Sequence, residues 1–133
     1  MGDLVQWLRA QLDDDAEAAQ RAFSGQLDPE NGWGAYRPEG QRHTTITPHV
    51  GMIHEAVQAD HVIAWNPARA LREIDAKRQI VALCEPPLVD VTGPGDTERS
   101  FMPGEGPPWG MDVLKLLALP YADRPSYRDE WRP

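Results

Sequence analysis

The stretch NPARALREIDAKRQIVALC, residues 66–84, carries the clearest structural signal in the sequence. Asn66 is a preferred helix N-cap, and Pro67 suits the first helical turn because the N–H it lacks would have no acceptor there. The apolar residues that follow fall along one side of a helix: Ala70, Ile74, Val81 and Cys84. This pattern predicts an amphipathic helix over residues 67–84, ended by two consecutive prolines.

Two more amphipathic helices are expected near the ends of the chain. In residues 3–23, apolar side chains recur every three or four positions after Asp3, a candidate N-cap. Residues 112–119 are rich in leucine and begin with Asp112, a second candidate cap. Because such apolar surfaces are unfavourable in water, we expect the three helices to pack into one core.

Short β-like segments lie between the first and the central helix. Residues 33–36 and 43–47 predict two strands, and residues 50–57 fit either a third strand or the start of a helix. A short helix over residues 58–65 is expected to end there, because Pro67 disfavours helical geometry in the residue before it. The sequence thus predicts an α+β domain, mainly helical, with a small antiparallel β element in residues 33–57.

Residues 85–108 contain six prolines and four glycines and show no helical or alternating pattern. This composition predicts a surface loop, with Leu88, Val89 and Val91 as its only β-like patch. An ordered functional loop is the alternative. After the last helix, an aromatic tail is expected to fold back onto a single domain that spans residues 1–133.

The charge and the cysteine content restrict the classes of function. A net charge of −8 opposes binding to nucleic acid, because affinity for phosphates rests on lysine and arginine. No segment approaches the roughly 20 consecutive apolar residues of a membrane-spanning helix. The one cysteine cannot form an intramolecular disulfide, and the N-terminus has neither a basic start nor an apolar signal core. A cytoplasmic protein without membrane contact is expected.

Four histidines within 19 residues are the first candidates for chemistry: His43, His49, His54 and His61. His54 and His61 are seven residues apart and do not form the H-E-x-x-H pair of zinc enzymes, so we predict no metal site. The sequence has neither a P-loop nor a dinucleotide-binding fingerprint, so we also predict no cofactor. For an enzyme, the candidate acid and base residues are His54, Glu55, Asp60 and His61. Cys84 ends its helix, where the helix dipole disfavours a thiolate, so a buried structural cysteine is expected.

Three segments of the chain resemble a known family. They are DLVQWLRAQLDDD at residues 3–15, ADHVIAWNPARALREIDAKRQIV at 59–81 and LKLLALPYADRPSYRDEWRP at 114–133. In this order they are similar to the signature blocks of an actinobacterial family of unknown function, numbered 6221, of Streptomyces-like bacteria and their phages. The resemblance implies a domain outline and a source, but no activity, cofactor or catalytic residue. Members often carry a histidine before an Asp-Pro pair, where this chain has Trp65 before Asn66 and Pro67.

Three functional hypotheses follow from these observations. The first is a noncatalytic accessory or protein-binding domain of phage or mobile-element origin. Aromatic residues are enriched at protein interfaces, so the candidate interaction residues are Tyr121, Tyr127 and Trp131. The second is a small metal-dependent or hydrolytic enzyme that uses the histidine-containing segment 43–61. The third is an acidic mimic of nucleic acid, suggested by the negative charge and the phage association.

Overall fold

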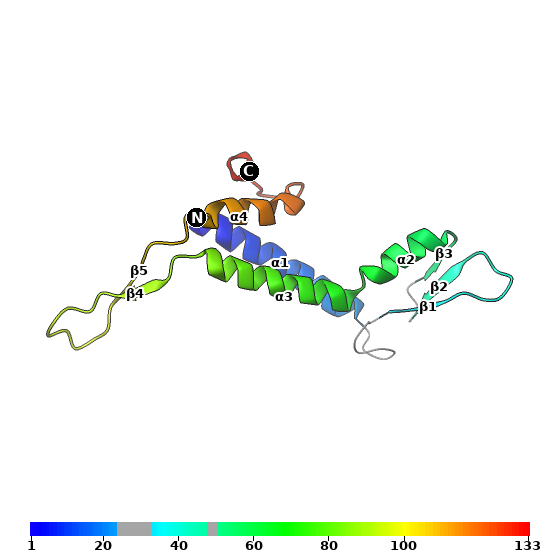
Figure 1. The fold of residues 1–133 in the computed structure, drawn as a ribbon, viewed down its shortest axis with the longest axis horizontal. Coiled ribbons are helices and arrows are strands. Elements are labelled where there is room, and N and C mark those ends of the chain that lie inside the picture. Colours follow the sequence, from blue (N-terminus) through cyan, green and yellow to red (C-terminus); the bar gives the residue numbers. More distant parts are fainter. Residues whose placement is uncertain (24–32, 48–50) are drawn as a thin grey trace. The chain divides into compact units, whose positions relative to one another are not determined.

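The computed structural model describes residues 1–23, 33–47 and 51–133 (Figure 1). Its helices are α1 (Gly2–Ala22), α2 (Ala56–Ala64), α3 (Pro67–Cys84) and α4 (Gly110–Ala118), with short 3-10 turns η1 (Leu119–Tyr121) and η2 (Asp129–Trp131) after α4. Its strands are β1 (Gly34–Tyr36), β2 (Thr44–Thr47), β3 (Gly51–Ile53), β4 (Leu88–Asp90) and β5 (Phe101–Pro103). The predicted α+β class is confirmed.

The chain divides into two compact units. The terminal unit comprises residues 1–11 and 77–133, and the central unit comprises residues 12–76. Helices α1 and α3 contribute residues to both units. The single domain expected over residues 1–133 stays a prediction. Among the described residues, no helix combines the length and the apolar character needed to cross a bilayer.

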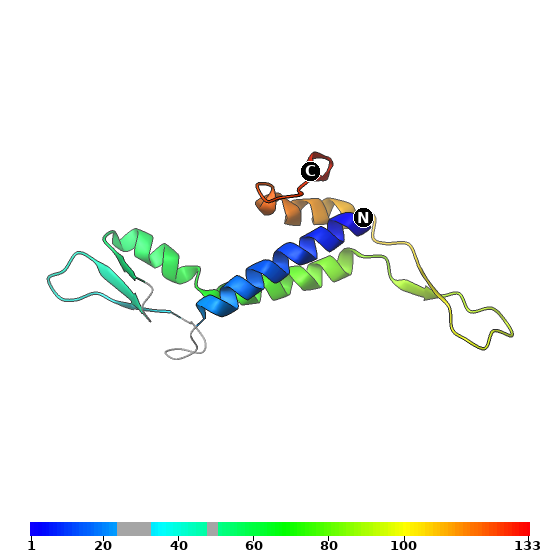
Figure 2. The same cartoon turned by 180° about the vertical axis from the view of Figure 1, so that it is seen from behind.

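The core of the terminal unit is built from three helices. Six side chains are at most 1% exposed, two from each of α1, α3 and α4: Leu4, Leu8, Val81, Cys84, Leu114 and Ala118. Helix α4 runs beside the first turns of α1 (Figure 2). It also approaches α3 closely, because a Cβ atom on Gly110 would lie 2.7 Å from the Cys84 carbonyl oxygen. Within this unit the expected packing of three helical apolar stripes is confirmed.

The central unit contains a three-stranded antiparallel sheet in the order β1-β2-β3. Buried and half-buried side chains alternate along β2, with Thr44 and Ile46 each 1% exposed. Helix α2 packs on this sheet and buries Ala59 completely. The buried hydroxyl of Thr44 accepts hydrogen bonds from Nε and Nη2 of Arg37 at 3.0 and 2.8 Å, so a polar atom in this small core is satisfied.

Asn66 joins α2 to α3 through both ends of its side-chain amide. Its Oδ1 accepts from the N–H of Arg69 at 3.0 Å, which is the N-cap bond predicted from sequence. Its Nδ2 donates to the carbonyl oxygen of Ile63 at 2.9 Å, near the end of α2. Because Asn66 is buried, one side chain fixes both the start of α3 and the direction in which the chain enters it.

We therefore expect Asn66→Ala to lower the free energy of unfolding by about 1–2 kcal/mol. Asn66→Asp keeps the acceptor for the Arg69 N–H and removes only the donor to Ile63. Its free energy of unfolding should therefore fall by less than that of Asn66→Ala. Urea denaturation of the three proteins, followed by circular dichroism, compares these values. An alanine variant as stable as the wild type would contradict the capping role.

Two predicted N-cap residues instead lie inside the first helical turn. Helix α1 begins at Gly2, one residue before Asp3, and the N-cap of α4 is Trp109, three residues before Asp112. Both carboxylates are still well placed, because a negative charge in the first turn interacts favourably with the helix dipole. Asp3 has a further role, since its Oδ2 lies 3.2 Å from Nη1 of Arg128 in the C-terminal tail.

Candidate protein-interaction site

The candidate acid and base residues are only partly brought together. His54 and Glu55 line an open pocket of about 550 Å³ on the central unit, with Arg37, Gln41, Arg42 and Ala56. The two residues are neighbours in sequence, so their shared pocket follows from adjacency alone. Asp60 and His61 do not belong to this lining. The ring of His61 instead lies 6.0 Å from the ring of Trp65.

The histidines do not form a metal-binding cluster within the part of the chain that the structure describes. No group of three or more His, Cys, Asp and Glu side chains there is placed to hold an ion. His43 is half-buried, while His54 and His61 are exposed. His49 lies outside the described residues, so the enzymatic use of segment 43–61 stays a prediction.

Cys84 lies in the helical core rather than at a reactive surface. Its side chain is buried, and this burial raises the pKa of the thiol. A raised pKa means that the thiol stays protonated to higher pH, whereas nucleophilic attack requires the thiolate. The environment of Cys84 is therefore that of a structural residue.

Folded protein at pH 8 should react with a thiol-directed disulfide reagent on the order of 100-fold more slowly than protein unfolded in guanidinium. A control carries Cys84→Ala together with Leu83→Cys, because residue 83 is 68% exposed on the same helix. That thiol should react rapidly in the folded state. Equal rates for the wild type in the folded and unfolded states would refute the burial of Cys84.

The C-terminal tail folds back onto α1 through an aromatic cluster, as predicted. The rings of Trp7, Tyr127 and Trp131 lie 5.3 to 5.9 Å from one another, and Nε1 of Trp7 donates to the carbonyl oxygen of Pro125 at 3.1 Å. Trp131 is 6% exposed. These contacts make the tail part of the terminal unit.

Tyr121, the first of the predicted interaction residues, is also buried. Its ring is covered by the guanidinium of Arg124 at 4.7 Å and by the ammonium of Lys77 at 5.7 Å. Tyr121, Tyr127 and Trp131 therefore contribute mainly to holding the tail in place. Their role in partner binding stays a prediction.

Within the loop predicted for residues 85–108, two three-residue strands pair to form a β-hairpin, and the other residues have no regular secondary structure. Strands β4 and β5 pair antiparallel in the register Leu88↔Pro103, Val89↔Met102 and Asp90↔Phe101. Two further main-chain bonds flank this register, from Gly104 N–H to Pro87 at 2.7 Å and from Val91 N–H to Ser100 at 2.9 Å. Each strand has three residues, which is too short to produce a readable alternation in a proline-rich sequence.

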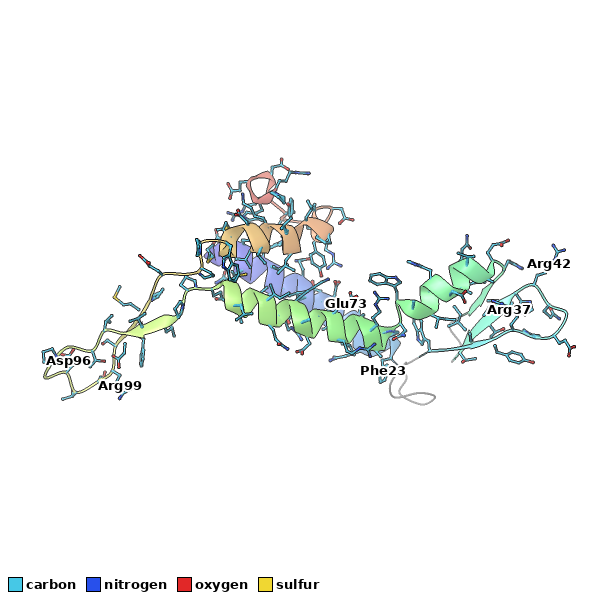
Figure 3. All side chains as sticks on the ribbon, viewed as in Figure 1. Phe23, Arg37, Arg42, Glu73, Asp96 and Arg99 are labelled. Carbon is cyan, nitrogen blue, oxygen red and sulfur yellow. The ribbon has the colours of Figure 1, made fainter. Side chains whose placement is uncertain are left out.

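Side chains near the tip hold the hairpin in register. The carboxylate of Asp90 accepts hydrogen bonds from the hydroxyl and the N–H of Thr92, which lower the pKa of Asp90. The hydroxyl oxygen of Thr92 in turn accepts from the N–H of Ser100 at 3.1 Å. At the far end, where Figure 3 labels Asp96, its carboxylate accepts from the N–H of Gly93 at 2.7 Å. The tip is thus a defined turn.

Both faces of this hairpin expose apolar side chains. The exposed fractions are 70% for Leu88, 46% for Val89, 47% for Val91, 52% for Phe101 and 59% for Met102, and we call these five residues the hairpin patch. Leu88 and Pro103 also line a pocket of about 460 Å³ at the base of the hairpin, together with Met1, Val5, Pro86 and neighbouring residues of α1. The patch is therefore continuous with a partly apolar hollow, the base pocket.

A family model described as a family of unknown function (DUF6221) matches residues 1–133. The chain belongs to DUF6221. No curated protein and no solved structure matches it. The DUF6221 match covers both units, so the hairpin lies within the region matched by the family model.

Trp65 lies at the junction between α2 and α3 of this DUF6221 chain. The guanidinium of Arg69 lies 4.0 Å from the centre of the Trp65 ring, and its Nε pairs with Glu73 at 3.2 Å. Such stacking of a cation on an aromatic ring is favourable. In this DUF6221 member, residue 65 therefore stabilises the junction between α2 and α3.

Proposed function

We propose that this chain is a noncatalytic protein-binding domain that contacts its partner through the hairpin patch. The observation that supports the proposal is a paired β-hairpin whose five apolar side chains are each at least 46% exposed. Exposed apolar side chains are costly in water, and where several gather on one element of a soluble protein they commonly mark an interaction site. An ordered hairpin also loses little conformational entropy on binding.

The candidate sites named from the sequence support a binding role less well. Tyr121 and Trp131 are buried and have little surface to offer a partner. The pocket beside His54 and Glu55 has an acid and a base residue only because they are consecutive. The net charge of −8 opposes nucleic acid as the partner. We propose that this binding role is an accessory one in the cytoplasm of an actinobacterium or its phage, as the sequence resemblance suggests.

A matched pair of double variants tests the proposal. Leu88→Gln with Met102→Gln removes two apolar side chains of the hairpin patch, and Leu83→Gln with Leu116→Gln removes two similarly exposed ones from α3 and α4. All four positions are exposed, so both variants should keep the stability of the wild type within about 0.5 kcal/mol per substitution. Each protein is used to capture partners from a lysate of the encoding organism, and these are quantified by mass spectrometry.

The hairpin variant should lose at least one partner by about 10-fold or more, because truncating central apolar contacts commonly costs 1–2 kcal/mol each. The helix variant should retain that partner. Equal capture by both variants and the wild type, or an equal loss from both variants, would contradict binding through the hairpin patch.

A further inference from the structure

The main-chain ladder shows which hydrogen-bonding groups of the hairpin remain available. In an antiparallel pair, every second residue bonds across the ladder and the residues between turn their N–H and C=O outward. The bonds at Pro87 and Val91 place the odd-numbered residues of β4 in the ladder. Leu88 and Asp90 therefore direct their N–H and C=O away from β5, and Phe101 and Pro103 do the same on the opposite edge.

The two outer edges differ in their capacity to pair with another strand. On the β5 edge, Pro103 occupies an outward position and has no N–H to donate, a feature that protects strand edges against pairing. On the β4 edge, Leu88 and Asp90 keep both donors and both acceptors. Within residues 1–23, 33–47 and 51–133, no third strand pairs with β4.

Side chains on both faces extend the contact area beside the β4 edge. Directly opposed residues share a face, so Leu88 lies on the side of Pro103, and these two residues line the base pocket. Val89 and Met102 lie on the other face. A strand added to β4 would therefore place its alternate side chains beside exposed apolar groups on either face and next to the base pocket.

The negative charge of the hairpin indicates whether the strand that pairs with β4 comes from a second copy of this chain or from a different protein. Residues 85–105 carry five carboxylates, from Glu85, Asp90, Asp96, Glu98 and Glu105, against the single guanidinium of Arg99, for a net charge of −4. Glu85 is paired with Arg9 of α1, and Asp90 Oδ2 lies 3.8 Å from Arg99 Nη1, so the charge offered to a partner comes mainly from Asp96, Glu98 and Glu105. Two such hairpins would repel each other, as would two chains of net charge −8. A strand that carries lysine or arginine is attracted instead.

We infer that the outer edge of β4 binds an extended, positively charged segment of a partner protein by strand addition, an inference that rests on the proposed function. The segment has apolar residues that contact the hairpin patch and basic residues that face the carboxylates of the hairpin. Main-chain hydrogen bonds to Leu88 and Asp90 would align the partner segment along β4. Side-chain contacts with the hairpin patch would select the sequence of that segment.

Selection of a phage-displayed library of random 12-residue peptides on the full chain provides the probe. The most enriched peptide is synthesised, and its affinity is measured by fluorescence anisotropy for two pairs of variants. Leu88→Pro and Leu88→Ala both remove the leucine side chain, but only the proline also removes the outward N–H. Phe101→Pro and Phe101→Ala make the same comparison on the edge that Pro103 already interrupts. Neither proline removes a bond of the β4–β5 ladder.

The enriched peptides should combine β-branched or aromatic residues with lysine or arginine, and their affinity should fall as salt is added. Leu88→Pro should bind the peptide about 3- to 10-fold more weakly than Leu88→Ala, which corresponds to one lost main-chain hydrogen bond. Phe101→Pro and Phe101→Ala should bind it equally.

Failure of the library to yield a basic, strand-forming peptide would overturn the inference, as would equal affinities of Leu88→Pro and Leu88→Ala. A wild-type dimer in sedimentation experiments that Leu88→Pro dissociates would also overturn it, because the occupant of the edge would then be a second copy. In each of these cases the lysate capture with the glutamine variants still decides independently whether the hairpin binds a protein.

Discussion

Leu114→Ala is expected to lower the free energy of unfolding by about 2–5 kcal/mol. Leu114 is 0% exposed and projects from α4 into the core shared with α1 and α3. Replacing its isobutyl group with a methyl group gives up the transfer free energy of three carbon atoms and leaves a cavity that closely packed helices cannot fill. Since net stabilities of small proteins are about 5–15 kcal/mol, this one change should remove a large share of the stability.

Leu116→Ala is the control for that prediction. Leu116 lies two residues away on the same helix and is 58% exposed, so its loss should change stability by about 0.5 kcal/mol or less. Guanidinium unfolding followed by tryptophan fluorescence measures both variants. If Leu116→Ala were as destabilising as Leu114→Ala, the assignment of the core face of α4 would be wrong.

Trp131→Ala is expected to cost about 3–5 kcal/mol, the range for a large buried aromatic side chain. Trp131 is 6% exposed and contacts the rings of Trp7 and Tyr127, and the guanidinium of Arg128 lies 5.1 Å from its own ring. Its loss should release the C-terminal tail from α1. Trp7 should then become more exposed, because the residues that cover it belong to that tail.

Trp109→Ala gives the matched comparison, since Trp109 is 50% exposed at the start of α4. Thermal unfolding and limited proteolysis distinguish the two variants. Trp131→Ala should unfold at a clearly lower temperature and be cleaved within the tail, whereas Trp109→Ala should behave like the wild type. A Trp131→Ala variant with a protected tail would show that the aromatic cluster does not hold the tail.

The helices were predictable because their signals are local. Asn66 and Pro67 mark the start of α3, and the Pro-Pro pair after Glu85 marks its end, so its predicted bounds agree with the structure. The segment from residue 50 to 57 was ambiguous because it contains both a strand and the start of a helix. Strand β3 ends at Ile53, and α2 begins at Ala56. Helices α1 and α4 begin one and two residues before their predicted starts, at Gly2 and Gly110.

The hairpin was not predictable from periodicity. Of the two strands, only β4 contains a β-branched residue, and β5 ends in proline, which is unfavourable within a sheet. Its register depends on bonds between separated positions, such as Thr92 with Ser100, which no spacing rule identifies. The exposure of Leu88 and Met102 likewise depends on the whole fold, because apolar residues are usually expected inside.

The aromatic tail shows how composition can identify a segment without identifying its role. The density of aromatic residues correctly predicted a tail that folds back. Composition could not show that Trp7, more than 100 residues away in sequence, would cover Tyr127 and Trp131. The surface that we propose for interaction is instead the exposed hairpin, which has no tryptophan or tyrosine between Leu88 and Pro103.

Site-specific photo-crosslinking in the encoding organism tests the binding role of the hairpin most directly. A benzophenone amino acid replaces Met102 in the hairpin patch or, as a control, Leu116 on α4, two positions that are 59% and 58% exposed. The proposal predicts a discrete crosslinked protein from position 102 and none from position 116. The same crosslinked protein from position 116 with none from position 102 would contradict it.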